Sequence, residues 1–549
     1  MIRIGNASGF YGDRFSAVRE MLTGGPLDYL TGDYLAELTM LILGRDRMKD
    51  ASRGYARTFL RQLEDSLDLA LEKGVRIVTN AGGLNPAGLA AAVRELNPRA
   101  KVAHVEGDDL RHRGFDGALT ANAYLGCWGI VECLNAGADI VVTGRVTDAS
   151  LVVAPAAHHF GWGREDFDQL AGATVAGHVI ECGTQATGGN FAFFTEIPDL
   201  AHPGFPIAEI GSDGSAVITK HASTGGAVTV DTVKAQLLYE IGGPRYLGPD
   251  VTSRFDTIRL TQDGPDRVAI AGVAGEAPPD TLKVCVNTLD GFRNSMTFVL
   301  CGLDVDAKAA LARQQLADAV GADGLEWTLA RTDHPDADTE EAASALLHVT
   351  IRTPGPKRAK AFSRAAVELA LASYPGFTLT SPPGDGSPVG VYRPEYVSQD
   401  SVEHVAVLPD GTRTTIAPPN VRAVDSAPAV EDDSPVPGGP TRRVPLGTIV
   451  GARSGDKGGD ANLGVWVRDP AAYPWLAAEL TVDRVRELLP EARDLDIERH
   501  PLPNLTAVNF VLHGLLGKGV AASSRFDPQA KSLGEWLRSR YADIPEELL

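Results

Sequence analysis

Apolar and polar residues alternate along the chain in the pattern of strands joined by helices. The runs 75–79, 101–105 and 138–143 are largely apolar, as in strands that are buried on both faces of a parallel sheet. The stretches 52–73 and 86–96 repeat apolar residues at helical spacing, and the second begins with a proline, which favours a first helical turn. This order predicts an α/β core with a large parallel or mixed sheet.

The pattern of the following residues predicts further sheet and helices. Residues 122–136 have helical periodicity, whereas 255–303 alternate in short apolar and polar runs, which indicates strands. Helical periodicity returns at 307–319 and 357–373, on either side of a strand expected at 346–351. We therefore expect the α/β core to extend over residues 1–380.

A change in composition divides the rest of the chain. Residues 381–443 are rich in proline, glycine and acidic residues and have little periodicity, so we interpret them as a turn-rich extension and linker. The following residues, 444–541, have the length of a small domain. Their pattern indicates two helices and about four strands, which predicts an α+β domain of ferredoxin-like type.

Charge and cysteine content exclude several classes of protein. The formal net charge of −20 disfavours nucleic acid and anionic membrane surfaces as partners, because both need a basic surface. The five cysteines are odd in number and form no CxxC pair, which indicates reduced thiols rather than a disulfide framework or a zinc knuckle. The sequence has no signal-peptide pattern and no apolar run of about 20 residues. We expect a cytoplasmic protein and, at this size, a homo-oligomer.

Polar residues and glycines follow two of the expected strands. Asn80, Gly82 and Gly83 follow the first, and Arg145 and Asp148 follow another. Ligands bind at the carboxyl ends of such strands, so we expect Asn80, Gly82 and Gly83 to contact a ligand. The alternative is an ordinary tight turn between the strand and the next helix. Arg145 fits a carboxylate or phosphate clamp, and Asp148 fits a base. The alternative for this pair is an internal salt bridge with a helix cap.

The stretch 173–191 carries the densest group of reactive side chains. If residues 173–183 are helical, then His178, Glu181 and Cys182 lie on one side of the helix. They can act as base, acid and nucleophile or as metal ligands, or they can be buried polar groups that satisfy the backbone. Glu181 fits acid–base chemistry best, because a carboxyl beside an apolar run should have a raised pKa. Asn190 follows a glycine pair that would let a ligand approach.

A loop before another expected helix resembles an anion site. Its candidate residues are Lys220, Ser223, Thr224, Gly225 and Gly226. They precede Thr229, a good N-cap for the following helix, and would present hydroxyl and N–H groups to a carboxylate or a cofactor phosphate. The Walker A and GxGxxG patterns are absent, so the sequence does not support an NTPase or an NAD-binding protein.

The C-terminal domain has a glycine-rich and charged segment of its own at 453–462. Arg453 and Lys457 can bind an anion together with backbone amides. Asp456 and Asp460 can instead bind a hard cation. The alternative is a solvated hairpin loop.

Several of these segments together resemble the acyclic terpene utilisation A (AtuA) family. They are residues 143–150, 181–190, 224–234, 246–254 and 453–462. The resemblance implies a large α/β core over about residues 1–360 and a fused ferredoxin-like domain. It also implies breakdown of acyclic terpenoids such as citronellol and geraniol through CoA thioesters. The step that the resemblance implies is a lyase reaction that releases acetate from a branched 3-hydroxyglutaryl-CoA.

The residues and the resemblance favour an enzyme with a small-molecule substrate, a lyase or hydratase of a branched 3-hydroxyacyl-CoA. Arg145 would clamp the substrate, and Glu181 and Asp148 would transfer protons. The loops at 223–226 or 453–459 would bind the CoA phosphates. A divalent metal can assist a retro-aldol cleavage, but the sequence assigns no cofactor. The alternatives are a non-catalytic CoA- or carboxylate-binding subunit of a degradation complex, and an enzyme acting on an unrelated hydroxy or keto acid.

Overall fold

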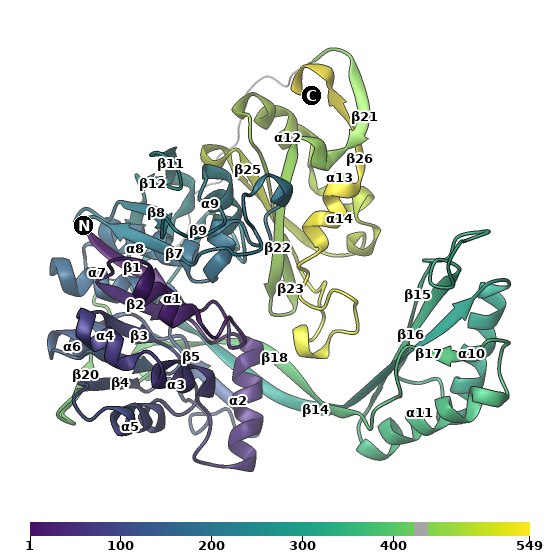
Figure 1. Ribbon diagram of the computed structural model, residues 1–549, viewed down its shortest axis with the longest axis horizontal. Helices are drawn as coiled ribbons and strands as arrows, with labels where there is room; N and C mark the ends of the chain where they lie inside the picture. The colour runs from purple at the N-terminus through teal and green to yellow at the C-terminus, as the bar shows by residue number, and fades with distance from the viewer. Residues whose placement is uncertain (422–437) are drawn as a thin grey trace. The chain divides into compact units, whose positions relative to one another are not determined.

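A computed structural model describes residues 1–421 and 438–549 of the chain (Figure 1). These residues form two compact units. The first contains Met1–Asn287, Tyr392–Val520 and Asp527–Leu549, and the second contains Thr288–Val391 and Ala521–Phe526. We call residues 441–520 and 527–549 the C-terminal domain and the rest of the first unit the core.

The core is built on a mixed sheet of eleven strands, which confirms the predicted fold class (Figure 1). Its centre is parallel, in the spatial order β1 (Ile2–Asn6), β2 (Tyr29–Gly32), β3 (Arg76–Thr79), β6 (Ile140–Thr143) and β4 (Val102–Glu106). Antiparallel strands extend one edge, in the order β7 (Pro206–Ile210), β8 (Ala216–Lys220), β12 (Val268–Ala271) and β11 (Arg259–Gln262). The other edge continues into β19 (His404–Val407) and β20 (Arg413–Ile416).

Helices cover both faces of the parallel centre. Ile77 of β3 packs with the first group of helices and the next residue, Val78, packs with the second, because successive side chains of a strand point to opposite faces. The first group is α1 (Ala17–Gly24), α3 (Arg57–Glu64), α4 (Leu67–Lys73) and α5 (Pro86–Leu96). The second is α6 (Trp128–Asn135), α7 (Ser150–Phe160) and α8 (Phe167–Ile180). Both faces of the sheet are therefore buried, as its apolar strands predicted.

Two predicted helices differ from the structure. The single helix expected at 52–73 is two helices, α3 and α4, and the break falls at Asp65 and Ser66, which are weak helix formers. The helix expected at 122–136 begins only at Trp128, because residues 120–123 form β5, which pairs with β14. Long-range strand pairing overrides the local helical pattern there. The helix predicted at 86–96 is confirmed, with the Asn85 side chain accepting from Gly88 N at 3.0 Å.

The second unit is a smaller sheet covered by two helices. The long strand β14 (Thr281–Cys301) begins in the first unit and continues into the second, where it pairs with β16 (Ser344–Thr353). The sheet is completed by β15 (Leu325–Ala330) and β17 (Thr378–Leu379), and its buried side chains pack on α10 (Val305–Val320) and α11 (Pro356–Glu368). The helices and the strand expected at 307–373 are present.

The stretch 381–443 contains more regular structure than its composition predicted. Residues Ser387–Ser398 form β18, which pairs with β14, and β19 and β20 extend the core sheet. Ala406 of β19 is fully buried, so pairing with β4 and packing give order to short strands that look irregular in sequence. The part of the expected linker at 422–437 lies outside the described residues.

The C-terminal domain is an antiparallel sheet with helices, as expected for an α+β domain. Its strands follow the spatial order β22 (Val450–Lys457), β23 (Asp460–Val467), β25 (Ala507–Leu512) and β24 (Ile497–Leu502). Its helices are α12 (Tyr473–Glu479), α13 (Val482–Leu488) and α14 (Leu533–Ser539), and β21 (Thr441–Pro445) pairs with β26 (Tyr541–Pro545). The segment expected as a loop at 453–462 instead forms the two arms of the β22–β23 hairpin, because only Gly458 and Gly459 are needed for the turn.

No helix in the described parts of the chain is both long and apolar enough to cross a membrane.

Candidate functional site

Polar side chains gather where the parallel strands β2 and β3 end, at the edge where such sheets bind ligands. Asp33 follows β2, and Asn80 follows β3. Asn80 Nδ2 donates to Asp33 Oδ1 at 2.6 Å, and Asn80 Oδ1 accepts from Tyr34 N at 2.7 Å. Burial, followed by the charge of Asp148, raises the pKa of Asp33 well above its usual range. Asn80 therefore fixes the loop after β2 and positions the Asp33 carboxyl, whose neutral form is favoured.

The two glycines after β3 serve close packing. A Cβ on Gly82 would lie 2.4 Å from the Thr143 carbonyl oxygen, and Gly83 has a φ of +53° beside Leu43. Both features describe the tight strand-to-helix turn that was the alternative to ligand contact. The structure thus gives these positions a backbone role.

Arg145 is buried and has several partners. Its Nη1 donates to Leu35 O at 3.1 Å and to Asp148 Oδ1 at 2.7 Å, and its guanidinium lies 4.2 Å from the centre of the Tyr124 ring. Its Nε is buried with no hydrogen-bond partner among the described residues. The salt-bridge alternative for Arg145 and Asp148 is thus realised, and one donor remains for a ligand.

Glu37 and Lys283 add a fixed ion pair beside Arg145. Glu37 begins α2 (Glu37–Lys49), accepts from Tyr124 Oη at 2.7 Å, and lies 3.4 Å from Lys283 Nζ. Burial raises the pKa of Glu37, but Lys283 and Arg145 offset this and lower its pKa to about 2. Glu37 is therefore ionised at neutral pH, in contrast to Asp33.

The end of α8 presents a buried carboxyl–imidazole pair. His178 Nδ1 lies 3.0 Å from Glu181 Oε1, and their side chains are 1% and 10% exposed. Burial, assisted by the charges of Asp148 and Glu240, raises the pKa of Glu181 well above its usual range. Burial also lowers the pKa of His178 to about 4. These shifts favour a hydrogen bond between two neutral groups. Glu181 Oε2 is buried with no partner among the residues described.

Cys182 lies next to this pair but lacks the environment of a nucleophile. Burial, followed by the charges of Glu181 and Glu240, raises the pKa of its thiol well above 9.0. The reactive form of cysteine is the thiolate, so the thiol is inert at neutral pH. Its backbone packs against Gly9, where an added Cβ would lie 2.6 Å from Cys182 C.

The C-terminal domain brings charged residues to the same region. Lys457 Nζ, at the end of β22, donates to Glu240 O at 2.6 Å. The Arg453 guanidinium lies 4.3 Å from the centre of the Tyr239 ring, and it bonds the side chain of Gln185 in the central stretch. The two predicted anion-binding residues of this domain therefore reach Glu240 and the central stretch, which are more than 200 residues away in sequence.

The predicted anion loop at 220–226 uses its donors internally. Lys220 Nζ donates to Thr224 O at 2.7 Å and lies 3.1 Å from Asp266 Oδ2. Gly225 N donates to His202 O at 3.0 Å, and Gly226 N donates to Pro198 O at 2.9 Å. These N–H groups therefore hold neighbouring loops together instead of facing an anion. Ser223 is exposed.

Asn190 contacts the C-terminal domain through its backbone. Its side chain is exposed, its φ is +57°, and its carbonyl oxygen accepts from Arg453 Nη1 at 3.5 Å. A contact of its side chain with a substrate stays a prediction.

Several residues of the site had no clear signal in the sequence. They are Asp33, Glu37, Tyr124, Tyr239, Glu240, Tyr246 and Lys283. The ring of Tyr246 lies tilted against that of His178, with centroids 5.2 Å apart. Burial, then the charge of Glu181, raises the pKa of its phenol. The one available cue was the close spacing of two acids, Asp33 and Glu37.

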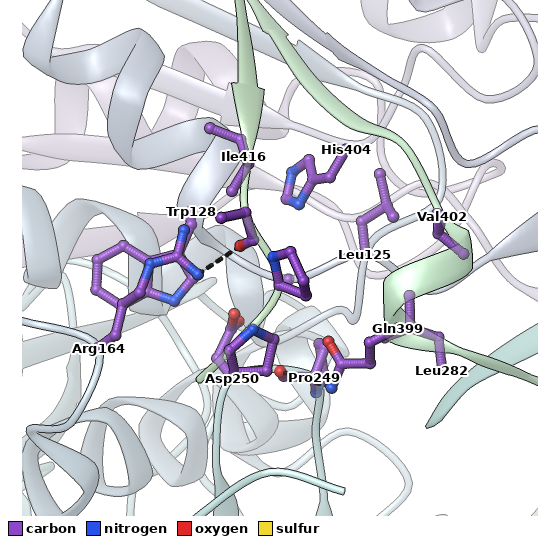
Figure 2. Close-up of a pocket in the computed structure, with 14 residues that line it drawn as sticks. Leu125, Trp128, Arg164, Pro249, Asp250, Leu282, Gln399, Val402, His404 and Ile416 are labelled. Carbon is purple, nitrogen blue, oxygen red and sulfur yellow. Dashed lines mark hydrogen bonds between the residues drawn. The ribbon is translucent and has the colours of Figure 1, made fainter. Parts of the chain in front are cut away.

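Two other features bear on ligand binding. The described residues include no group of three or more His, Cys, Asp or Glu side chains arranged to hold a metal ion, so a metal requirement stays a prediction. A pocket elsewhere in the first unit is lined by Trp128, Asp250, Gln399 and His404, with Arg164 donating to Ala417 O at 2.7 Å (Figure 2). It contains none of the predicted site residues.

Comparisons with known proteins give a family for both parts of the chain. The family model described as "Acyclic terpene utilisation family protein AtuA" matches residues 2–408. A second model, described as "AtuA ferredoxin-like domain", matches residues 444–542 and confirms the predicted ferredoxin-like domain. Neither a search of curated proteins nor a search of solved structures found a match.

Proposed function

The chain belongs to the acyclic terpene utilisation AtuA family, and from that premise we propose that it is a lyase or hydratase of a branched 3-hydroxyacyl-CoA. Membership supports a role in terpene catabolism. The observation that carries the finer proposal is the buried pair of Glu181 and His178, with its free Oε2. A carboxyl with a raised pKa is a stronger base when ionised and a ready acid when protonated, as proton transfer at a carbon centre requires.

In the lyase reaction on a branched 3-hydroxyglutaryl-CoA, Glu181 would act in its ionised form and accept the proton of the 3-hydroxyl group. The C3–O bond becomes a carbonyl, the C3–C4 bond breaks, and its electron pair stays on C4, next to the free carboxylate, as the enolate form of acetate. Glu181 then returns the proton to C4, so acetate and a 3-oxoacyl-CoA leave and the protein ends unchanged. His178 accepts or donates at the other carboxyl oxygen and orients it.

The developing negative charge needs a fixed cation, because preorganised charge contributes most to such reactions. Arg145 is held by Leu35, Asp148 and the Tyr124 ring, and its Nε is free. Lys283 is held by Glu37. Because these contacts fix both side chains, we assign stabilisation of the enolate oxygen to Arg145 and Lys283.

A Glu181→Gln variant tests this proposal. Glutamine keeps the size and the hydrogen bond to His178 but cannot transfer a proton. We expect turnover of a branched 3-hydroxyacyl-CoA to fall by roughly 10²–10⁴-fold, with binding of the same thioester within about threefold of wild type in calorimetry. Binding with no turnover by the wild-type protein would instead favour a non-catalytic binding subunit.

A further inference from the structure

Three basic side chains of the C-terminal domain converge near the central stretch, and they contact two neighbouring residues of the core, Tyr239 and Glu240. The Arg453 guanidinium lies 4.3 Å from the centre of the Tyr239 ring, and Lys531 Nζ lies 4.9 Å from the same centre and bonds the Tyr239 hydroxyl. Lys457 Nζ donates to the Glu240 carbonyl oxygen at 2.6 Å. These three cations therefore border one small region.

No carboxylate in the described parts of the chain lies within ion-pair distance of these cations. Their partners are uncharged: the Gln185 side chain, the Asn190 and Glu240 carbonyls and the Tyr239 hydroxyl. This is unusual in a chain whose net charge is −20, because buried charges are normally paired.

The neighbouring carboxylates of Glu240 and Glu37 act on Lys457 only from beyond ion-pair distance. Burial and the charge of Glu240 raise the pKa of Asp456 to about 8, and burial raises that of Glu181. These shifts favour the neutral form of both carboxyls. Arg453 is only 6% exposed, so water gives its charge little compensation. The arrangement lacks an anion that a ligand can supply.

We propose that Arg453, Lys457 and Lys531 bind a carboxylate of the substrate, so that the C-terminal domain forms part of the active site. This inference rests on the proposed function for the identity of the substrate. Arg453 bonds Gln185, four residues from Glu181, so the bound carboxylate lies near the acid–base pair. A branched 3-hydroxyacyl-CoA with a second, free carboxylate fits this arrangement, because it carries an anion close to the carbon that reacts.

The hairpin that carries two of these cations is fixed on the core. A Cβ on Gly455 would lie 2.5 Å from the Tyr239 ring, and a Cβ on Gly464 would lie 2.5 Å from the Leu238 side chain. Glu240 N also donates to Asn462 Oδ1 at 2.8 Å. The cations are thus held in place before a ligand binds, which lowers the entropy that binding must overcome.

The test uses the full chain and 3-hydroxy-3-methylglutarate, a branched dicarboxylate with a 3-hydroxyl group, in titration calorimetry. Lys457→Gln and Lys531→Gln each remove one cation, Lys457→Arg keeps it, and Lys518→Gln is a control at an exposed lysine of the same domain. We expect each of the first two to weaken binding by about tenfold or more, since charge-assisted hydrogen bonds contribute about 1.5–3 kcal/mol. Lys457→Arg should recover much of the loss, and Lys518→Gln should stay within about twofold of wild type.

Several results would overturn the inference. Equal affinity of wild type and Lys457→Gln for the acid would do so, and so would a wild-type protein that binds no acid. If the variants lose affinity for inorganic phosphate or free CoA but not for the acid, the three cations bind a phosphate group and not a carboxylate. Acid binding that depends on Lys457, in a protein that turns over no acyl-CoA, would retain the inference and refute the proposed reaction.

Discussion

Replacing Glu181 by alanine and by glutamine should affect stability very differently, because the pair with His178 is neutral. Burial raises the pKa of Glu181 and lowers that of His178 to about 4, which favours the protonated carboxyl and the uncharged imidazole. Glutamine preserves a donor to His178 Nδ1 and the length of the side chain. Alanine removes the partner of an imidazole that is 1% exposed.

The magnitudes follow from burial. Glu181→Ala leaves a buried acceptor unsatisfied, which costs about 1–3 kcal/mol, and loses one buried methylene group at about 0.8 kcal/mol. We expect a loss of about 3 kcal/mol in the free energy of unfolding. For Glu181→Gln we expect a loss below about 1 kcal/mol. If the pair were ionised, glutamine would leave a buried imidazolium unpaired, and the loss would be about 3–5 kcal/mol.

Urea unfolding at pH 7, with equal m-values for the three proteins, measures both differences. The account requires wild type and Glu181→Gln to have nearly the same midpoint and Glu181→Ala a clearly lower one. A glutamine variant that is destabilised as much as the alanine variant would show that the pair is ionised, and the reasoning from burial would be refuted.

Three further predictions follow from single residues. Cys182→Ser should retain turnover within about threefold, because the buried thiol is protonated. A roughly 100-fold loss of turnover in a kinetic assay would instead identify Cys182 as a nucleophile. The folded state binds the Asp456 proton up to about pH 8 and the unfolded state only up to about pH 3.8, so stability falls as pH rises between these values, by at most about 1.4 kcal/mol per pH unit. In urea titrations from pH 5 to 8, Asp456→Asn should flatten this slope, and an unchanged slope would contradict the assignment. Gly455→Ala should lower the free energy of unfolding by about 1–3 kcal/mol through its clash with Tyr239, whereas Gly242→Ala, where the added Cβ meets nothing within 4 Å, should show no such loss.

Local sequence predicted those parts of the site whose partners are close along the chain. His178 and Glu181 are three residues apart at the end of one helix, and Arg145 and Asp148 are three apart after one strand. Their contacts follow from helical and turn geometry. The apolar run before Glu181 also predicted the raised pKa that burial produces.

Parts of the site that depend on distant segments could not be predicted in this way. Lys457 meets Glu240 across 217 residues, and no local pattern encodes that contact. The donors of Gly225 and Gly226 are taken by the carbonyls of His202 and Pro198, so a loop that looks free in sequence is occupied in the fold. The hairpin arms at 453–462 looked like a loop because glycines also mark turns, whereas Gly455 is needed there for close packing on Tyr239.

Product analysis of the wild-type protein tests the proposed reaction itself. The purified chain is incubated with a branched 3-hydroxyglutaryl-CoA, and the products are identified by mass spectrometry. We expect cleavage into acetate and a shorter 3-oxoacyl-CoA, or, for a hydratase, loss of one water to give the unsaturated thioester. An intact thioester after prolonged incubation with a protein that binds it would contradict the claim that Glu181 and His178 catalyse a reaction at this site.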